Sequence, residues 1–469
     1  MTEPLDLVIR GGTVATASAE FKADIGIRDG RIVTLAVELP RAKDEIDATG
    51  KLVLPGGVDA HCHFDQPTSD GSRMADDFAS GPLSAAFGGT TTVIPFACQQ
   101  KGQSLRAAVS DYHERANGKS VIDYAFHLIV TDPTEQVLGQ ELPALIRDGY
   151  SSFKIYTTYD DLKLDDRQII EVLALAKREG ALTMIHAENS DIIAWLTEAL
   201  ERAGDTAPRF HATARPAIAE REATHRAISL AEVVDTPILV VHVSGGEAMQ
   251  QIVTARHRGT RVFAETCPQY LFLTADDLDL GGFEGAKHIC SPPPRDTASQ
   301  ESVWRGLQDG TFQVFSSDHA PFRFDDPEGK KVGGETSGFS HVPNGIPGVE
   351  TRLPLLFSEG VVKGRISLRR FVELTSTNPA RLYGLMPRKG TIAIGSDADI
   401  AIWDPQKQVT ITNDMLHHNV DYTPYEGRQV TGWPEIVLSR GAVVIRDGEC
   451  LGNPGRGQFL ECGTPDTLP

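Results

Sequence analysis

Residues 52–64 read LVLPGGVDAHCHF, an apolar run that leads into two histidines, His61 and His63. A short apolar run bounded by turn residues is typical of a buried β-strand. Side chains two residues apart on a strand lie on the same face, so both imidazoles can bind one metal ion. Two unrelated surface histidines could share this spacing, but the glycine-containing strand before them makes a metal site the more specific interpretation.

Seven further strand-like runs follow this one, and helical patterns separate several of them. They cover residues 90–97, 121–130, 151–156, 181–189, 237–244, 261–265 and 312–319. Residues 166–180 and 219–234 have apolar side chains at three-to-four spacing, and the first of these segments ends in Gly180, which predicts two helices. Eight β units with helical connections predict an α/β fold of the (β/α)8 TIM-barrel type.

The two ends of the chain have a different pattern, with short alternating strands between GG and DG turns. We therefore expect residues 1–54 and 389–450 to form a small β-sandwich beside a barrel of residues 55–388. Residues 451–469 are rich in glycine, proline and polar side chains and predict an irregular C-terminal arm that could grip a neighbouring subunit.

The composition is that of a globular protein, with 40% hydrophobic and 23% charged residues in 469. The formal net charge of −19 disfavours nucleic acid and anionic membranes as partners. The chain has no apolar stretch of about 18 residues and no signal pattern in MTEPLDLVIR, so we expect a cytoplasmic protein. The six cysteines form no CxxC pair, which argues against a thiolate zinc site.

Most of the strong strands end in a residue that can bind a metal. Besides His61 and His63, these residues are Lys154, His186, His242 and Asp318. The carboxyl ends of barrel strands form the active-site face of this fold, so all six would meet at one mouth. Taken singly, His186 and His242 could be hydrogen-bonded core histidines, and Asp318 could cap a helix.

Lys154 lies between apolar residues in SSFKIY, where an unpaired ammonium is costly. It could extend to the strand end or pair with a carboxylate. Among four candidate histidine ligands, we favour a lysine that has reacted with CO₂ to form a carbamate, an oxygen anion that can bridge two metals. With two Zn²⁺, the carbamate, Asp318 and a bridging hydroxide would leave a net charge of roughly +1 to polarise a carbonyl.

These residues, together with longer motifs, resemble the dihydropyrimidinase/D-hydantoinase family of the amidohydrolase superfamily. The motifs are FKIYTTY (153–159), HAEN (186–189), RPAIAEREATHRAI (215–228), ETCPQYLFLT (265–274), CSPPPR (290–295), SSDHAPF (316–322), PNGIPGVETRLPLL (343–356), TSTNPARLYGLMPRKGTIAIGSDADI (375–400) and VDYTPYEG (420–427). The resemblance extends over nearly the whole chain.

The resemblance implies a set of roles. His61, His63, Lys154 and Asp318 would bind the more buried zinc, and carboxylated Lys154 would bridge to a second zinc held by His186 and His242. Tyr159 would donate a hydrogen bond to the developing oxyanion, while the main chain at Ser291 and Asn344 would hold the cyclic amide. Phe64 and Tyr156 would contact the substrate.

The implied reaction is hydrolysis of the cyclic amide bond of a dihydropyrimidine or hydantoin to an N-carbamoyl amino acid. A bridging hydroxide would attack the ring carbonyl, and Asp318 would act as general base and then as general acid. Relatives are commonly homotetramers, so the resemblance also implies a homotetramer.

The loop after His63, which usually contacts the exocyclic group of the substrate in the family, departs from the family pattern. Family members often read HLDMPFGGT where this chain reads HFDQPTSDG, so that Phe64, Gln66 and Thr68 replace Leu, Met and Phe. A more polar wall suits a small or polar substituent, although drift in an exposed loop would give the same change.

Allantoinase, dihydroorotase or cyclic imidase activity is the alternative among enzymes. Residues 64–66 lack the arginine that dihydroorotases typically carry there, which counts against that activity. A non-enzymatic scaffold of the same fold is the alternative of another class, but the chain retains all six candidate ligands.

Overall fold

The computed structural model describes residues 4–468, and its centre is a barrel of parallel strands. The barrel strands are β8 (Gly57–Cys62), β9 (Thr90–Cys98), the split third unit β10 (Asp123–Tyr124) and β11 (His127–Ile129), β12 (Ser152–Tyr156), β13 (Leu182–His186), β14 (Ile238–Val240), β15 (Val262–Thr266) and β16 (Val314–Phe315). Just beyond β16, the amide of Asp318 donates to the carbonyl of His61 (2.8 Å) and closes the barrel. The predicted (β/α)8 fold is confirmed.

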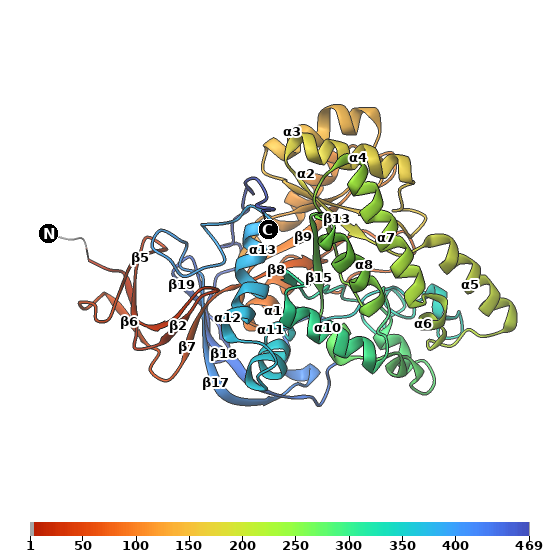
Figure 1. Ribbon diagram of the computed structural model, residues 1–469. Coiled ribbons are helices and arrows are strands. Elements are labelled where there is room, and N and C mark those ends of the chain that lie inside the picture. Colours follow the sequence, from red (N-terminus) through yellow and green to blue (C-terminus); the bar gives the residue numbers. More distant parts are fainter. Residues whose placement is uncertain (1–3, 469) are drawn as a thin grey trace.

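Helices surround the barrel (Figure 1). They are α1 (Ser80–Phe87), α2 (Leu105–Ala116), α3 (Leu142–Arg147), α4 (Asp166–Glu179), α5 (Ser190–Ala203), α6 (Phe210–Ala214), α7 (Ala217–Val234), α8 (Gly246–His257), α9 (Gln269–Phe272), α10 (Thr297–Asp309), α11 (Arg352–Leu356), α12 (Leu368–Val372) and α13 (Asn378–Leu382). Helix α4 begins with a capping box between Asp165 and Gln168 and ends at Gly180 in the left-handed conformation. Both helices predicted from the sequence, α4 and α7, are present.

The two chain ends meet in β-sheets on the left of Figure 1, as expected. One sheet has the order β5 (Arg31–Ala36), β4 (Asp24–Arg28), β1 (Leu7–Arg10), β6 (Asp44–Asp47). The other has the order β20 (Glu449–Cys450), β19 (Ala442–Arg446), β18 (Gln429–Ser439), β17 (Ile400–Thr410), β7 (Leu52–Pro55), β2 (Thr13–Ala15), β3 (Glu20–Lys22). Ile9, Val53 and Ile400 belong to their shared apolar core.

The stretch 52–64 contributes to both parts of the molecule. Strand β7 lies between β2 and β17 in the terminal sheet, and β8 begins the barrel only at Gly57. The junction needs glycine, because a Cβ on Gly56 would lie 2.1 Å from the hydroxyl of Thr91. One apolar run therefore joins the sandwich to the barrel.

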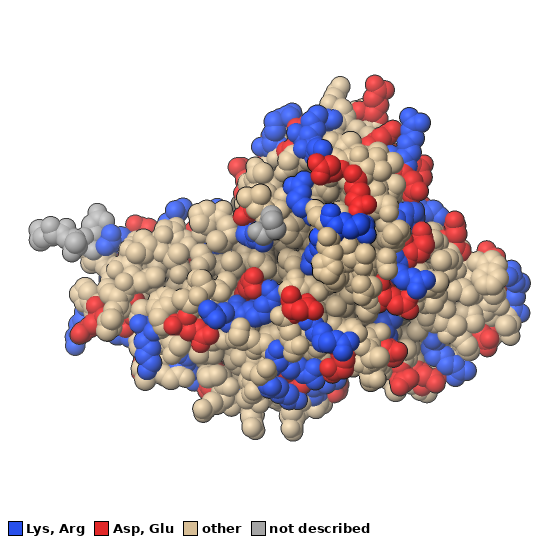
Figure 2. All heavy atoms as spheres, in the orientation of Figure 1, with Lys and Arg blue, Asp and Glu red and all other residues tan. Residues whose placement is uncertain are grey.

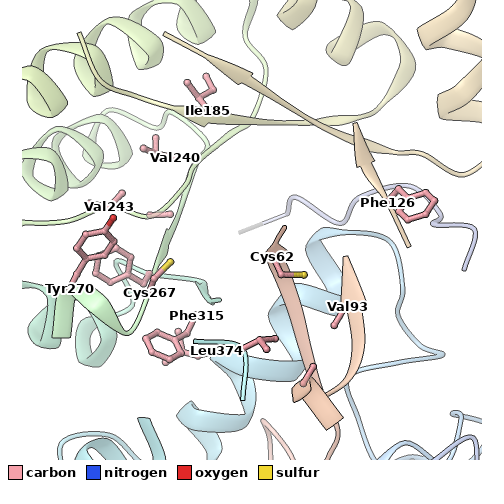
Figure 3. Close-up of a cluster of buried hydrophobic side chains, with 14 of the residues drawn as sticks. Cys62, Val93, Phe126, Ile185, Val240, Val243, Cys267, Tyr270, Phe315 and Leu374 are labelled. Carbon is pink, nitrogen blue, oxygen red and sulfur yellow. The ribbon is translucent and has the colours of Figure 1, made fainter. Parts of the chain in front are cut away.

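Side chains alternate across the barrel wall as the strand pleat requires. Leu182 and Met184 of β13 belong to the apolar cluster inside the barrel. Cys62, Val93 and Phe315 belong to the larger cluster that also includes residues of the surrounding helices (Figure 3). Cys62 thus packs in the barrel wall, as expected for the residue between two ligands.

The C-terminal arm runs along the amino end of the barrel of its own chain. The amide of Leu460 donates to Tyr124 O (2.7 Å), and the amide of Cys462 donates to Gly149 O (2.9 Å). Leu460 and Cys462 are buried with the apolar residues inside the barrel. This end of the barrel is therefore closed.

Acidic and basic side chains are intermixed on the face seen in Figure 2. Within residues 4–468, none of the helices combines the length and the apolar character needed to cross a membrane.

Candidate metal centre

The structure brings all six predicted ligand residues together at the carboxyl end of the barrel. Lys154 Nζ donates to His61 Nε2 (2.9 Å), and His61 Nε2 lies 3.1 Å from Asp318 Oδ1. His63 Nε2 lies 3.5 Å from the same oxygen. These four residues come from β8 and the residue that follows it, from β12 and from the segment after β16, which are far apart in the sequence.

The remaining two histidines complete the group. The ring centroids of His186 and His242 are 4.4 Å apart, and those of His61 and His242 are 5.4 Å apart. His186 ends β13 and His242 follows β14, so each occupies the position that the strand pattern predicts. All these side chains are buried or nearly so.

Acceptors on the outer side of three histidines fix their orientation. His61 Nδ1–H donates to Glu265 Oε1 (2.6 Å), and His63 Nδ1–H donates to Gln66 Oε1 (2.7 Å). His186 Nε2–H donates to Glu188 Oε2 (2.8 Å). Each contact puts the proton on the outer ring nitrogen and leaves a lone pair on the inner one, which is the arrangement that metal-binding histidines show.

The charge state of the group also suits metal binding. Burial lowers the pKa of His61, His186 and His242, so these imidazoles are neutral and can act as ligands. Burial raises the pKa of Asp318, but the nearby His61 and His63 outweigh it and hold that pKa below its usual range. The carboxylate therefore stays ionised.

Lys154 is the exception among these groups. Burial lowers its pKa to about 8, although Asp318 and Glu265 oppose the shift. Within residues 4–468 its amine makes no ion pair shorter than 4.0 Å. It hydrogen-bonds to His61, and the rings of Phe96 and Tyr156 lie 4.6 and 4.8 Å away. An uncompensated buried ammonium is costly, whereas a carbamate at this place would be an anion among neutral imidazoles.

The donor set fits divalent metal ions. The ligand atoms of His61, His63 and Asp318 all lie within 4.8 Å of one another. His242 Nδ1 is buried and has no hydrogen-bond partner, so this residue too has an unused donor. Imidazole and carboxylate ligands of this kind suit zinc, manganese and cobalt alike.

Three residues of the mouth have left-handed backbone conformations that side chains rarely adopt. These are Tyr159 (φ 68°), His242 (φ 40°) and Asp318 (φ 49°). Such strain persists only where the surrounding structure enforces it, and it concentrates at functional sites. The sequence pattern places His242 and Asp318 at strand ends, and the family resemblance selects Tyr159, but neither shows the backbone conformation.

A cavity of about 330 Å³ opens onto the group. Its lining includes five residues with predicted roles in the reaction or in substrate binding: Tyr156, Tyr159, Ser291, Asp318 and Asn344. Burial raises the pKa of Tyr159 to about 12, although Arg215 opposes the shift, so its hydroxyl keeps its proton near neutral pH. The Ser291 hydroxyl donates to Asn344 Oδ1 (3.0 Å), which joins the two segments that carry these residues.

Phe64 is not where we expected it. Its ring is fully buried between Phe78 and His319, with centroids 6.1 and 5.8 Å away, and it does not line the cavity. His63 turns toward the ligands and the next side chain points the opposite way, as in an extended chain. The expectation of a substrate contact for Phe64 is therefore corrected, and Gln66 and Thr68 form that part of the wall.

The sequence pattern predicts no role for the residues that orient the ligands. Glu188 accepts from His186 and from Arg215 (both 2.8 Å), and the Arg215 guanidinium lies 5.2 Å from the centre of the Tyr159 ring. Glu265 accepts from His61. These residues lie in the motifs HAEN, RPAIAERE and ETCPQY. The motifs can be recognised in the sequence, but the side chains that these residues bond to can be identified only in the structure.

Comparison with known proteins agrees with this geometry. Residues 52–444 match the model of the Amidohydrolase family. A D-hydantoinase from Streptomyces coelicolor is 47% identical over 97% of this chain and 98% of its own length. A D-hydantoinase from Ralstonia pickettii is 43% identical, with 97% of this chain and 99% of its own length covered.

The solved structures include a dihydropyrimidinase from Brevibacillus agri, which is 45% identical with a TM-score of 0.95 and covers 98% of this chain and 99% of its own. An L-hydantoinase from Arthrobacter aurescens is 29% identical with a TM-score of 0.88, over 97% and 99% of the two chains.

The fold and the ligand group thus define a barrel hydrolase of the amidohydrolase type. The chain belongs to this family, within its dihydropyrimidinase/D-hydantoinase group, and is a cyclic amidohydrolase, an enzyme that opens C–N bonds in cyclic amides.

Proposed function

We propose that this enzyme hydrolyses the ring of hydantoins or dihydropyrimidines to N-carbamoyl amino acids with two zinc ions bound by the six strand-end residues. The observation that carries the proposal is the convergence of His61, His63, Lys154, His186, His242 and Asp318 on one cavity of small-molecule size. In our proposal Lys154 is carboxylated and shared between the two ions. The names of the relatives supply the substrate class.

When bound, the metal pair would supply a hydroxide nucleophile at neutral pH and polarise the ring carbonyl. Asp318 would accept the proton of the attacking water and deliver it to the leaving ring nitrogen, since its carboxylate is ionised and lines the cavity. Tyr159 would donate its hydroxyl proton in a hydrogen bond to the developing oxyanion.

The ring would lie against two loops, with the main chain at Ser291 and Asn344 paired to its amide edges and Tyr156 beside it. Its substituent would then face Gln66, Thr68 and Asp70, which line the same cavity. This wall is polar, which favours small or polar substituents over large aromatic ones.

The cavity also argues against a substrate that carries a carboxylate, such as dihydroorotate. Among the described residues that line it there is no arginine, and its one lysine is Lys154. Arg215 is buried and already paired with Glu188. Allantoin and cyclic imides are neutral rings and remain the alternative substrates, and the intact ligand set speaks against a non-enzymatic scaffold.

A substrate panel on zinc-loaded protein tests the proposal. We expect turnover of hydantoin and dihydrouracil, with the ring-opened products identified by mass spectrometry. Turnover of only allantoin or dihydroorotate would contradict the substrate class. Absence of bound metal, and of activity after zinc and bicarbonate are supplied, would favour the scaffold.

We also propose that the protein is a cytoplasmic homotetramer, on the basis of the family resemblance and the chain's composition. Light scattering after size-exclusion chromatography tests the assembly. A mass of one chain, 50.8 kDa, would contradict it.

A further inference from the structure

Lys330 is a second buried lysine close to the cavity, and the proposed reaction does not use it. Its side chain is 1% exposed, and Nζ donates to the carbonyls of Ile289 (2.9 Å) and Pro343 (2.7 Å). Within residues 4–468 it forms no ion pair with a carboxylate. Burial lowers its pKa to about 7. Burying a lysine without a carboxylate partner costs free energy, and hydrogen bonds to the two carbonyls offset part of that cost.

The two carbonyls that Lys330 holds belong to the cavity wall. Ile289 comes directly before Cys290 and Ser291, and Pro343 directly before Asn344 and Gly345. These four following residues line the cavity, as Pro343 itself does. Lys330 therefore bonds to both segments, one or two residues before Ser291 and Asn344, whose main chain would hold the cyclic amide.

Other contacts join the same two segments, so Lys330 completes an existing junction. The amide of Gly345 donates to Ile289 O (3.0 Å), the same carbonyl that Lys330 contacts. The Ser291 hydroxyl donates to Asn344 Oδ1 (3.0 Å). Among the described residues outside the two segments, Lys330 is the one that bonds to both.

The loop that carries Lys330 is built to place it. The amide of Lys330 donates to Arg323 O (2.8 Å), and a Cβ on Gly329 would lie 2.1 Å from that carbonyl. The chain thus turns tightly over residues 323–330, and glycine permits the close approach. The neighbouring Lys331 points to the surface instead, where it pairs with Asp325 (2.9 Å) and Glu335 (2.6 Å).

We propose that Lys330 is a positioning residue for the substrate: through the carbonyls of Ile289 and Pro343 it holds the two main-chain segments that bind the edges of the cyclic amide. The inference rests on the proposed function for the identity of the ring. It makes no demand on the metal ions, because Lys330 contacts none of the six ligand residues.

The test compares Lys330→Met, which keeps the length and removes the donors, with Lys330→Arg, which keeps donors. For Lys330→Met we expect the KM for hydantoin or dihydrouracil to rise about tenfold, kcat to fall less than about threefold, and the metal content to match the parent. Lys330→Arg should keep KM within about threefold of the parent. Lys331→Met is the matched control, since it alters the same loop at the surface, and it should leave KM unchanged.

Hydrogen exchange gives a readout that does not depend on turnover. The amide of Gly345 should exchange faster in Lys330→Met than in Lys331→Met, because its acceptor segment is no longer held. If Lys330→Met does not fold, Lys330→Gln replaces it, with a smaller rise in KM because its amide keeps N–H donors.

The outcomes distinguish a failure of the proposed function from a failure of the positioning role of Lys330. An inactive parent contradicts the proposed function, and the exchange of Gly345 then still tests the inference. An active parent with parental KM and parental exchange in folded Lys330→Met or Lys330→Gln overturns the inference alone. A loss of bound metal in parallel with activity would also overturn it.

Discussion

The two ends of the barrel bury lysines in opposite ways. At the amino end, Lys389 pairs with Asp123 (2.7 Å) and Asp399 (2.6 Å), and these carboxylates raise its pKa although burial opposes them. At the carboxyl end, Lys154 is equally buried but is not paired with a carboxylate within 4.0 Å among the described residues, and burial lowers its pKa to about 8.

This is the difference we expect between a lysine that stabilises the fold and the lysine that we propose to be carboxylated. At Lys389 the cation is neutralised by carboxylates beside it, because an unpaired buried charge is expensive. A lysine whose amine is to react must be kept from forming such a pair. The amino end is also sealed by Leu460 and Cys462 of the arm, whereas the carboxyl end opens into the cavity.

Lys154→Ala tests most directly whether Lys154 has a role in metal binding that Lys389 lacks. We expect it to lose most of the bound metal and to lower activity by about a thousandfold, since one shared ligand of both ions is gone. A short-chain carboxylate such as acetate should restore part of the activity. Elemental analysis and hydantoin turnover measure this, and full metal content with normal turnover would show that Lys154 is not a carbamate.

Lys389→Met should affect stability and leave the chemistry intact. Removing the cation leaves Asp123 and Asp399 buried without it, which we expect to lower the free energy of unfolding by about 3 kcal/mol. The folded variant should keep the metal content and KM of the parent. A denaturant titration and kinetics decide this, and a variant as stable as the parent would contradict the structural role.

The effect of Lys389 on stability has a definite pH dependence. Its folded-state pKa is raised above the unfolded value of 10.5, so its contribution is complete below that pH and is lost as the pH rises through the folded pKa. The stability difference between parent and variant should therefore be present at pH 7 and shrink only on the alkaline side of about 10.5.

Gln66→Met, at the carboxyl end of the barrel, should have a smaller effect, on metal affinity. The variant loses the acceptor 2.7 Å from His63 Nδ1, and loss of such an orienting contact typically costs about tenfold in metal affinity. Competition with a chelator measures the affinity. Thr68→Val, in the same wall but without this contact to His63, should retain the parental affinity, and equal losses in both variants would contradict the orienting role.

Ser291→Ala should have the smallest effect. In our proposal the main chain at Ser291 holds the substrate, and its hydroxyl bonds to other protein side chains, Asn344 Oδ1 (3.0 Å) and His211 Nε2 (3.4 Å). We expect kcat/KM to stay within about threefold of the parent. A loss beyond tenfold would place the side chain itself on the substrate.

The barrel and the ligand group were predictable because both follow from local patterns. Strand pleating places residues at alternate positions on opposite faces, so His61 and His63 could be assigned to one face and Cys62 to the other. The C-terminal ends of parallel strands meet at one edge, so Lys154, His186 and Asp318 could be grouped from their positions alone. The structure confirms that these side chains meet.

Contacts between distant segments could not be predicted in this way. Nothing in the sequence shows that Glu265 accepts from His61, that Gln66 accepts from His63, or that Phe64 turns into the core. The left-handed backbone of Tyr159 is another such feature, because it depends on the whole surroundings of the residue.

The amino-acid sequence by itself determined the eight-unit barrel, the family resemblance and the positions of the six strand-end residues, because hydrophobic periodicity and motif spacing are local properties. Only the tertiary structure decided which carboxylates orient the ligands, which buried lysine is paired and which is not, and that Lys330 joins two segments of the cavity wall. Those features depend on distances between segments far apart in the chain, and such distances are fixed only when the core packs.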